Sequence, residues 1–301
     1  MLLALPVPSS TGFTDRLTNI GSIKNDGIEI TINSVNVEGE FTWNTNFNLA
    51  TVRNEVVDLG GIPRIIAGNA GFSNQLRIIE EGRPLNSFYG YQIDGIWQEN
   101  DDFEQTIDNV QPGALKFRDV NGDSTVNADD RMILGNSFPD ITLSLGNTFS
   151  YKGFNLYVFI EGIQGISMLN NNLVDTYFPI NFRRNKFAEP YLNRWTPENP
   201  SNEYPSFINP TAQGQKQVNS YTVQDASYIR LKTISFSYTL PKFSDAIRTA
   251  MVYFTADNLF TLTNYDGIDP AVNPNGNANI RIDYNAYPTS TNFLLGVKIG
   301  L

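Results

Sequence analysis

The clearest pattern in the chain lies in the segment Thr291-Asn-Phe-Leu-Leu-Gly-Val-Lys-Ile-Gly-Leu301. Successive side chains of an extended strand point to opposite faces, so the odd-numbered residues from Phe293 onward give this segment one apolar face. The opposite face is polar or small, with Leu294 as the exception. About ten residues with this alternation can cross a bilayer as one tilted strand of a β-barrel, and the same alternation also fits a strand of a soluble β-sandwich.

Further segments repeat the alternation and favour the barrel. In residues 40–52 and 141–151 the polar face consists mainly of Asn, Thr, Ser and Gly, which suits a water-filled lumen better than a packed core. Within residues 228–240 the apolar pattern shifts by one residue, which predicts a β-bulge. About seven strands are expected, at residues 27–37, 40–52, 141–151, 154–163, 228–240, 251–260 and 291–301.

Composition sets limits on function. The chain has 301 residues and a net charge of −10, which argues against nucleic acid as a partner. It contains neither cysteine nor histidine, so disulfides, thiolate zinc sites and histidine-based catalytic triads are excluded. No acid–base pair of carboxylates can be placed, because the adjacent Asp129 and Asp130 would point apart on a strand. The sequence therefore predicts neither an enzyme nor a protein with an organic cofactor.

The connections between the expected strands are of two lengths. Glu38-Gly39 and Lys152-Gly153 are tight turns of the kind found in β-hairpins. Residues 53–139 and 164–225 hold most of the Pro, Asn, Asp and Gly and are too long for the ordinary loops of a soluble domain. Outer-membrane barrels combine short turns inside the cell envelope with long loops outside it. We therefore expect an all-β chain that forms part of a transmembrane antiparallel β-barrel with long extracellular loops.

One segment, residues 119–130, has the spacing of a calcium-binding loop. Oxygen-bearing side chains occupy positions 1, 3, 5, 9 and 12 of the loop, and the residue at position 7 can offer its backbone carbonyl. Ser124 replaces the glycine usual at position 6, and Asp130 replaces the longer glutamate at position 12. The alternative is a surface turn held by side-chain hydrogen bonds to its own backbone. The expected Ca²⁺ ligands are Asp119, Asn121, Asp123, Thr125, Asn127 and Asp130.

A series of further segments forms a distinctive order along the chain. The series includes Asn19-Ile-Gly-Ser-Ile-Lys-Asn-Asp-Gly-Ile-Glu29, Glu81-Gly-Arg-Pro-Leu-Asn-Ser-Phe-Tyr-Gly-Tyr91, Asp94-Gly-Ile-Trp97, Asn193-Arg-Trp-Thr-Pro-Glu-Asn-Pro200, Ala226-Ser-Tyr-Ile-Arg-Leu-Lys232 and Tyr265-Asp-Gly-Ile-Asp-Pro270. Together with the loop at residues 119–130, it resembles the C-terminal part of the SusC/RagA family of TonB-dependent outer-membrane transporters of Bacteroidetes. The resemblance covers nearly the whole chain.

The resemblance implies that residues 1–301 are a piece of a larger protein. Members of the family carry a signal sequence, a TonB-contacting segment and a plug inside the barrel, and we expect these parts to be absent here. Barrels that hold a plug need about 22 strands, so about seven strands would form only one part of the wall. We expect residues 1–301 to be the C-terminal segment of such a barrel, which would not transport anything alone.

The same resemblance implies the function and the partners. The whole protein would import oligosaccharides or peptides through the outer membrane, with a SusD-like surface lipoprotein as its lid and the TonB complex as its source of energy. Tyr89, Tyr91 and Trp97 lie in the first long loop and are candidates for stacking on a ligand, although such side chains also pack loops against barrels. The alternative is a secreted soluble β-domain that binds glycans and uses calcium to order its loop.

Overall fold

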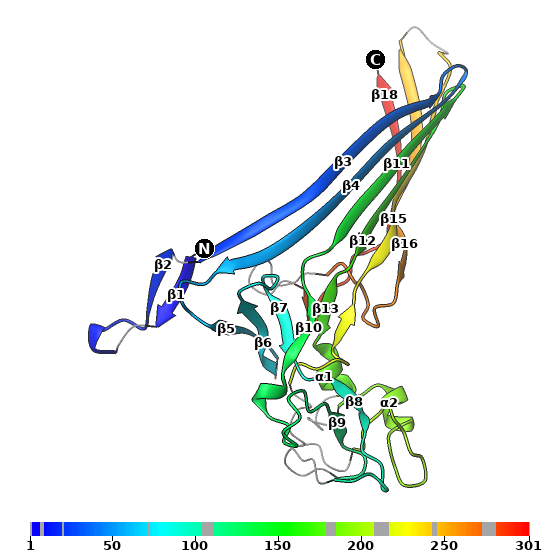
Figure 1. Ribbon diagram of the computed structural model, residues 1–301. Helices are drawn as coiled ribbons and strands as arrows, with labels where there is room; N and C mark the ends of the chain where they lie inside the picture. The colour runs from blue at the N-terminus through cyan, green and yellow to red at the C-terminus, as the bar shows by residue number, and fades with distance from the viewer. Residues whose placement is uncertain are drawn as a thin grey trace.

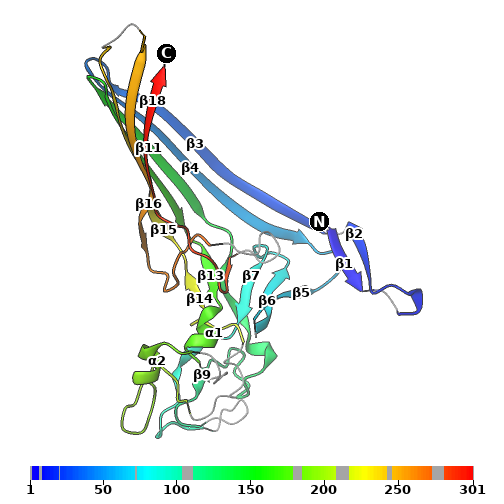
Figure 2. The same ribbon diagram turned by 180° about the vertical axis from the view of Figure 1, so that it is seen from behind.

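The computed structural model describes residues 2–6, 9–19, 21–71, 73–103, 111–178, 185–207, 217–242, 246–272 and 281–300. A long, curved antiparallel sheet has short turns at one end and a body of connections and small sheets at the other (Figure 1; seen from behind in Figure 2). No helix among the described residues is long and apolar enough to cross a membrane.

Seven strands form the curved sheet, which we call the wall. Neighbouring strands are antiparallel, in the order β18-β16-β15-β12-β11-β4-β3. Each segment expected from its alternation forms one of these strands, which confirms the all-β prediction, although Leu301 lies outside the described residues. The strands are β3 (Ser22–Val37), β4 (Phe41–Asp58), β11 (Ile141–Tyr151), β12 (Phe154–Gln164), β15 (Tyr228–Thr239), β16 (Thr249–Thr263) and β18 (Asn292–Gly300).

One face of the wall is apolar and open. The strand register aligns one side chain from each of the seven strands in a row across this face, namely Val37, Trp43, Phe149, Leu156, Phe236, Phe254 and Leu295. Within the part of the chain that the structure describes, no second sheet covers the row, and Leu295 is 75% exposed. A β-sandwich would bury these side chains against its other sheet. The open face is therefore the surface of a barrel wall that contacts lipid.

The opposite face of the wall is polar, and its side chains bond to one another across the strands. Thr31 donates a hydrogen bond to Asn48 at 2.9 Å, and Asn48 donates one to Ser144 at 3.2 Å. Toward the other edge of the wall, Thr233 donates to the Asp257 carboxylate at 2.7 Å. These cross-strand bonds satisfy polar groups without a packed core, as in the wet interior of a barrel.

Aromatic side chains gather on the apolar face near the short turns. The ring centroids of Phe41 and Phe149 are 6.4 Å apart, and those of Phe154 and Tyr238 are 4.2 Å apart. Barrels that cross membranes carry belts of aromatic side chains at the membrane–water boundary. The aromatic belt therefore marks one boundary of the apolar band on the wall.

Bulges interrupt the wall on both sides of β15. Toward β12, two adjacent residues of β12 pair with Thr233 and Leu231, so Lys232 is the extra residue on β15. Toward β16 the register also shifts, and two residues of β16, Asn258 and Leu259, lie opposite Lys232. On β16, Asn258 takes the left-handed conformation with a φ of 55°, which asparagine tolerates better than most residues. The shift of one residue in the apolar pattern of this segment is thereby explained, and the predicted bulge is confirmed.

The buried core lies outside the wall, in the long connections. Leu76, Phe88 and Leu169 pack in one apolar cluster there, and further clusters lie beside it. The connections contain the helices α1 (Asn172–Thr176) and α2 (Ala188–Leu192) and therefore have a folded core of their own. The smaller elements are β1 (Leu2–Pro6), β2 (Asp15–Asn19), β5 (Arg64–Ala70), β6 (Ser73–Glu80), β7 (Ser87–Gly90), β8 (Ile93–Ile96), β9 (Leu115–Phe117), β10 (Met132–Asn136), β13 (Ser167–Asn170), β14 (Val223–Asp225), β17 (Ile282–Asp283), and the 3-10 turns η1 (Ser9–Thr11) and η2 (Ala128–Asp130).

An ion pair at the end of β15 ties the connection before β18 to the wall. Arg230 and Asp269 are both almost fully buried, and their charged groups are 2.5 Å apart. Burial raises the pKa of Asp269, but hydrogen bonds from Thr289, the amide of Ala271 and the Arg230 guanidinium outweigh that effect and lower it to about 2. The carboxylate therefore stabilises the folded state in its charged form.

We expect arginine at two adjacent leucines of β18 to have opposite consequences. Leu295 faces the lipid side and is 75% exposed, whereas Leu294 faces the polar side and is 55% exposed. A lipid-facing arginine costs roughly 2–4 kcal/mol at mid-bilayer and less near the boundary. Leu295→Arg should therefore reduce the fraction of protein that resists urea extraction from outer membranes, while Leu294→Arg should leave most of it in place. Equal losses in both variants would contradict the assignment of the faces.

Asp269→Asn should destabilise the protein by roughly 3–5 kcal/mol, because it leaves Arg230 buried without a counter-charge.

The pKa of Asp269 rises from about 2 to its ordinary 3.8 on unfolding, so its contribution of roughly 2 kcal/mol is present above pH 4 and disappears as the pH falls toward 2. Unfolding midpoints in detergent, measured against pH, test this. The exposed pair of Arg118 and Asp94 supplies the control, since Asp94→Asn should change the unfolding midpoint far less.

Candidate functional site

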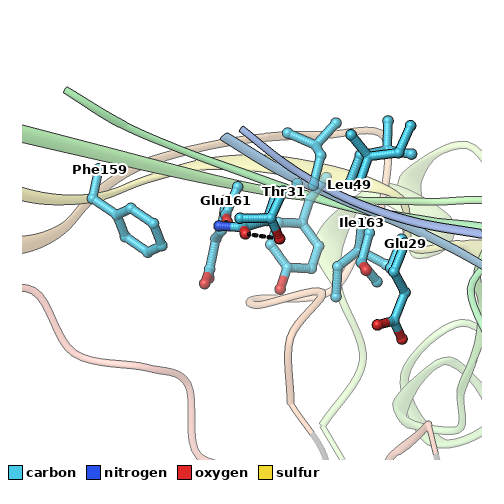
Figure 3. Close-up of a pocket in the computed structure, with 14 residues that line it drawn as sticks. Glu29, Thr31, Leu49, Phe159, Glu161 and Ile163 are labelled. Atoms are coloured by element: carbon cyan, nitrogen blue, oxygen red, sulfur yellow. Dashed lines mark hydrogen bonds between the residues drawn. The ribbon is translucent and has the colours of Figure 1, made fainter. Parts of the chain in front are cut away.

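The polar face of the wall contains a hollow of about 380 Å³, which we call the wall hollow (Figure 3). Strands β3, β4, β11 and β12 each contribute to it, as does Tyr228 at the start of β15. Glu29, Phe159 and Glu161 extend to one side of the sheet, whereas Leu49 extends to the other (Figure 3). The wall hollow thus opens on the side that would face the lumen of a closed barrel.

Charged and polar groups give the wall hollow its chemistry. The Glu161 carboxylate is 3.5 Å from the Lys232 ammonium group, and Glu29 is exposed on β3. The hydroxyl of Thr31 and the amide of Asn48 bond to each other beside these carboxylates. Such groups can hydrogen-bond to water or to a polar solute.

Flat aromatic rings also lie on the polar face. Tyr157 and Phe159 of β12 are stacked, with centroids 6.3 Å apart and planes at 8°. The ring of Tyr253 covers Gly296 of the neighbouring strand so closely that an added Cβ would lie 2.3 Å from it. A larger residue at this position would therefore need the ring to move. The alternation of β12 did not separate its two faces because these inward rings are as apolar as the outward side chains.

The expected calcium loop lies between β9 and β10, away from the wall. The carboxylate of Asp119 accepts hydrogen bonds from the amides of Gly122 and Ser124, both at 2.7 Å. The fully buried carboxylate of Asp130 accepts amide hydrogen bonds from Val120 at 2.9 Å and from Asn127 at 2.7 Å. The carboxylates of the first and last acidic residues of the loop therefore fix its backbone conformation by accepting hydrogen bonds from its amides.

Backbone geometry at the sixth position supports the loop conformation that the spacing predicts. Ser124 has a φ of 66°, which is the left-handed conformation for which calcium loops normally use glycine. Partial desolvation raises the pKa of Asp119, but hydrogen bonds from the amides of Ser124, Gly122 and Asp123 lower it below its ordinary value, with a further contribution from the adjacent Asp130. Asp119 therefore remains a charged carboxylate at neutral pH.

The donor set fits Ca²⁺ only if amide and carbonyl oxygens take part. Among the residues described, no three acidic side chains converge closely enough to hold a metal ion. Asn121 and Asp123 each also accept an amide hydrogen bond within the loop, from Asp123 at 2.9 Å and from Thr125 at 2.8 Å. Each carboxylate or amide oxygen has two lone pairs, so these bonds leave room for an ion. These hydrogen bonds also stabilise the loop conformation without a bound ion.

The three aromatic candidates for ligand contact lie in the folded core of the first connection. Tyr89 and Trp97 are each 5% exposed, and Tyr91 is partly buried with its ring edge-on to Phe117 at 5.5 Å. The Arg131 guanidinium lies 4.4 Å from the centroid of Tyr89 and donates to the Tyr89 carbonyl at 2.7 Å. These contacts give the rings a packing role. Ligand contact by the three rings stays a prediction.

Known proteins resemble the chain over nearly its whole length. No family model matches the chain. TonB-dependent receptor P3 of Formosa agariphila is 32% identical over 99% of the chain, and TonB-dependent receptor SusC of Bacteroides thetaiotaomicron is 28% identical over 99%. The chain spans about a third of the length of these curated relatives, 31% and 28% respectively. The relatives are named as receptors and not as enzymes.

Solved structures agree with the sequence relatives. The structure of the RagAB peptide transporter superposes on the chain with a TM-score of 0.79 at 28% identity, over 99% of this chain and 31% of that one. The RagAB peptide importer in its open-open state gives a TM-score of 0.77 at 26% identity. The two-faced wall, its folded connections and these relatives lead to one assignment. The chain belongs to the SusC/RagA family of TonB-dependent proteins of the outer membrane and corresponds to the C-terminal part of their β-barrel.

Proposed function

We propose that the chain supplies a stretch of barrel wall and extracellular connections to a transporter that imports nutrients across the outer membrane. One observation carries the proposal: the wall has an exposed apolar face on one side and a hydrogen-bonded polar face on the other. In a bilayer the outer strands β3 and β18 need further strands as partners, because an open sheet edge is not tolerated in lipid. The transporting unit is therefore larger than residues 1–301.

Oligosaccharides and peptides are the proposed cargo. The polar face presents hydroxyl, amide and carboxylate groups, and these can hydrogen-bond to sugars and to peptide bonds alike. The solved relative is named a peptide transporter, and the sequence relatives are named TonB-dependent receptors. We extend both properties to this chain, with a SusD-like surface lipoprotein as lid and TonB as the energy source. Tyr91, the most exposed of the three aromatic candidates, would be the first to touch a ligand.

The test of this function is uptake by whole cells. Cells that lack the gene should lose growth on one class of nutrient, either an oligosaccharide or a peptide mixture, and should regain it when the gene is restored. A SusD-like lipoprotein should copurify with the protein from detergent extracts. Recovery of the protein from the soluble fraction, or growth that is unchanged on every oligosaccharide and peptide source tested, would contradict the proposal.

Calcium at residues 119–130 is the second part of the proposal. It is supported by the ligand spacing, by the left-handed Ser124 and by the direct contact between the carboxyl groups of Asp119 and Asp130. A divalent cation bound here would be coordinated by both carboxylates and would tie β9 to β10. When bound, it would be held by carboxylate, amide and carbonyl oxygens of the loop and would supply order rather than reactivity.

Asp123→Ala should abolish a calcium-dependent rise in the melting temperature, because it removes the oxygen ligand at position 5. Asp129→Ala is the matched control, since it removes the same charge from the same loop at a residue that is not an expected ligand. Melting curves of the purified protein with calcium, with magnesium and with a chelator give the comparison. A melting temperature that does not respond to calcium in the unmodified protein would rule out the site.

A further inference from the structure

A second cavity lies in the connections, on the side of the molecule away from the short turns. It has a volume of about 280 Å³, and we call it the loop pocket. Segments that are far apart in the sequence meet there: helix α1 and the residues after it, and the stretches around residues 203, 221 and 266. The loop pocket is lined by Leu173, Tyr177, Phe178, Glu203, Ser220, Tyr221, Gln224 and Asp266.

The floor and walls of the loop pocket are apolar and held in place. Leu173 and Phe178 form a buried floor, exposed by only 5% and 1%. The ring of Tyr177 lies between those of Phe187 and Tyr204, at centroid distances of 6.0 Å and 5.8 Å. On the other side, the Tyr221 hydroxyl donates to the carbonyl of Asn202 at 3.4 Å, and the Tyr221 amide donates to Asn219 at 3.0 Å. The rings of Tyr177 and Tyr221 thus line the pocket in fixed positions.

The rim of the loop pocket is acidic. Glu203 and Asp266 are exposed there, and in the described part of the chain no lysine or arginine lines the pocket or forms an ion pair with either carboxylate. Asp266 accepts a hydrogen bond from the Gln224 amide at 2.8 Å, which orients it toward the pocket. Burial raises the pKa of the Tyr221 phenol, and the Glu203 charge raises it further. The rim therefore presents two carboxylates to the pocket, while the Lys186 ammonium is held by backbone carbonyls, including that of Phe178 at 2.9 Å.

We infer that the loop pocket binds a single ammonium or guanidinium group of the imported solute, with the Tyr177 and Tyr221 rings as walls and the Glu203 and Asp266 carboxylates as counter-charges. Aromatic rings and carboxylates together favour a cation, since the ring faces are negative and the carboxylates accept its N–H groups. The volume suits one side chain or one sugar unit. The inference deepens the proposed function, on which it rests, by making a positive charge part of the preferred cargo.

Two kinds of solute carry this group, and the experiment separates them. The probes are trilysine amide and the glucosamine trimer, each paired with its fully N-acetylated form, which keeps the chain and removes the positive charges. Binding to the full protein, purified from outer membranes in detergent, is measured by calorimetry at low and at high salt. We expect at least one cationic probe to bind roughly tenfold more tightly than its acetylated form, and to lose that advantage in high salt.

Substitutions assign that binding to the loop pocket. Glu203→Gln and Asp266→Asn keep the side-chain shapes and should each weaken the cationic probe several-fold, whereas Glu198→Gln, which lies on the exposed part of the same connection, should not. Tyr221→Phe should retain binding through its ring, and Tyr221→Leu should lose it. Equal affinity for the charged and acetylated probes, or full affinity in both charge variants, would overturn the inference.

The proposed transport function can be judged separately in the same strains. Outer-membrane location, copurification of the lipoprotein and uptake of an uncharged nutrient do not depend on Glu203 or Asp266. If these persist while the charged probes fail to bind, the loop pocket inference is wrong and the proposed function stands. If the unmodified protein is not found in the outer membrane and supports no uptake of any nutrient, the proposed function is wrong.

Discussion

Pairing of backbone groups along the whole length of the strands is the constraint on which the wall depends. Lipid offers no hydrogen-bond partner to an amide or carbonyl, so a strand that crosses a bilayer has to be satisfied by its neighbours. β11 meets β12 and β4 at every residue from Ile141 to Tyr151. Once the backbone is satisfied in this way, each strand can present hydrocarbon side chains to lipid and polar ones to water. The wall needs no buried apolar core, and its apolar face is exposed where the sheet of a soluble protein would pack against another layer.

The wall could be predicted from the sequence because its signal is local. Each strand carries the period of two in its own residues, and short turns such as Lys152-Gly153 fix which strands are neighbours. Even the bulge at Lys232, which β15 forms against β12, is visible as a change of parity in one segment. The faces of β12 were not separable, since its polar side carries Tyr157 and Phe159 where the neighbouring strands carry Thr, Ser or Gly.

The folded connections could not be predicted in the same way, because they depend on contacts between distant residues. The Trp195 indole donates to Gln98 at 2.9 Å, and the amide of Ile96 donates to Asn202 at 3.0 Å. Neither bond follows from a pattern in one segment. The loop at residues 119–130 was recognisable because its spacing is local, whereas the wall hollow joins Glu29 to Glu161 only through the order of the strands. Sites formed by topology were therefore missed, whereas the loop defined by its spacing could be proposed as a calcium site from the sequence alone.

The most direct measurement of the central claim is the accessibility of single positions along β11 to lipid and to water. The natural chain has no cysteine, so a spin label can be attached at one introduced cysteine at a time, from Leu143 to Phe149, in protein reconstituted into vesicles. Collision with oxygen reports lipid, and collision with a water-soluble nickel chelate reports water. The account predicts that the two signals alternate with a period of two, with oxygen highest at Leu143, Leu145 and Phe149. Signals without alternation, or with the opposite phase, would contradict it.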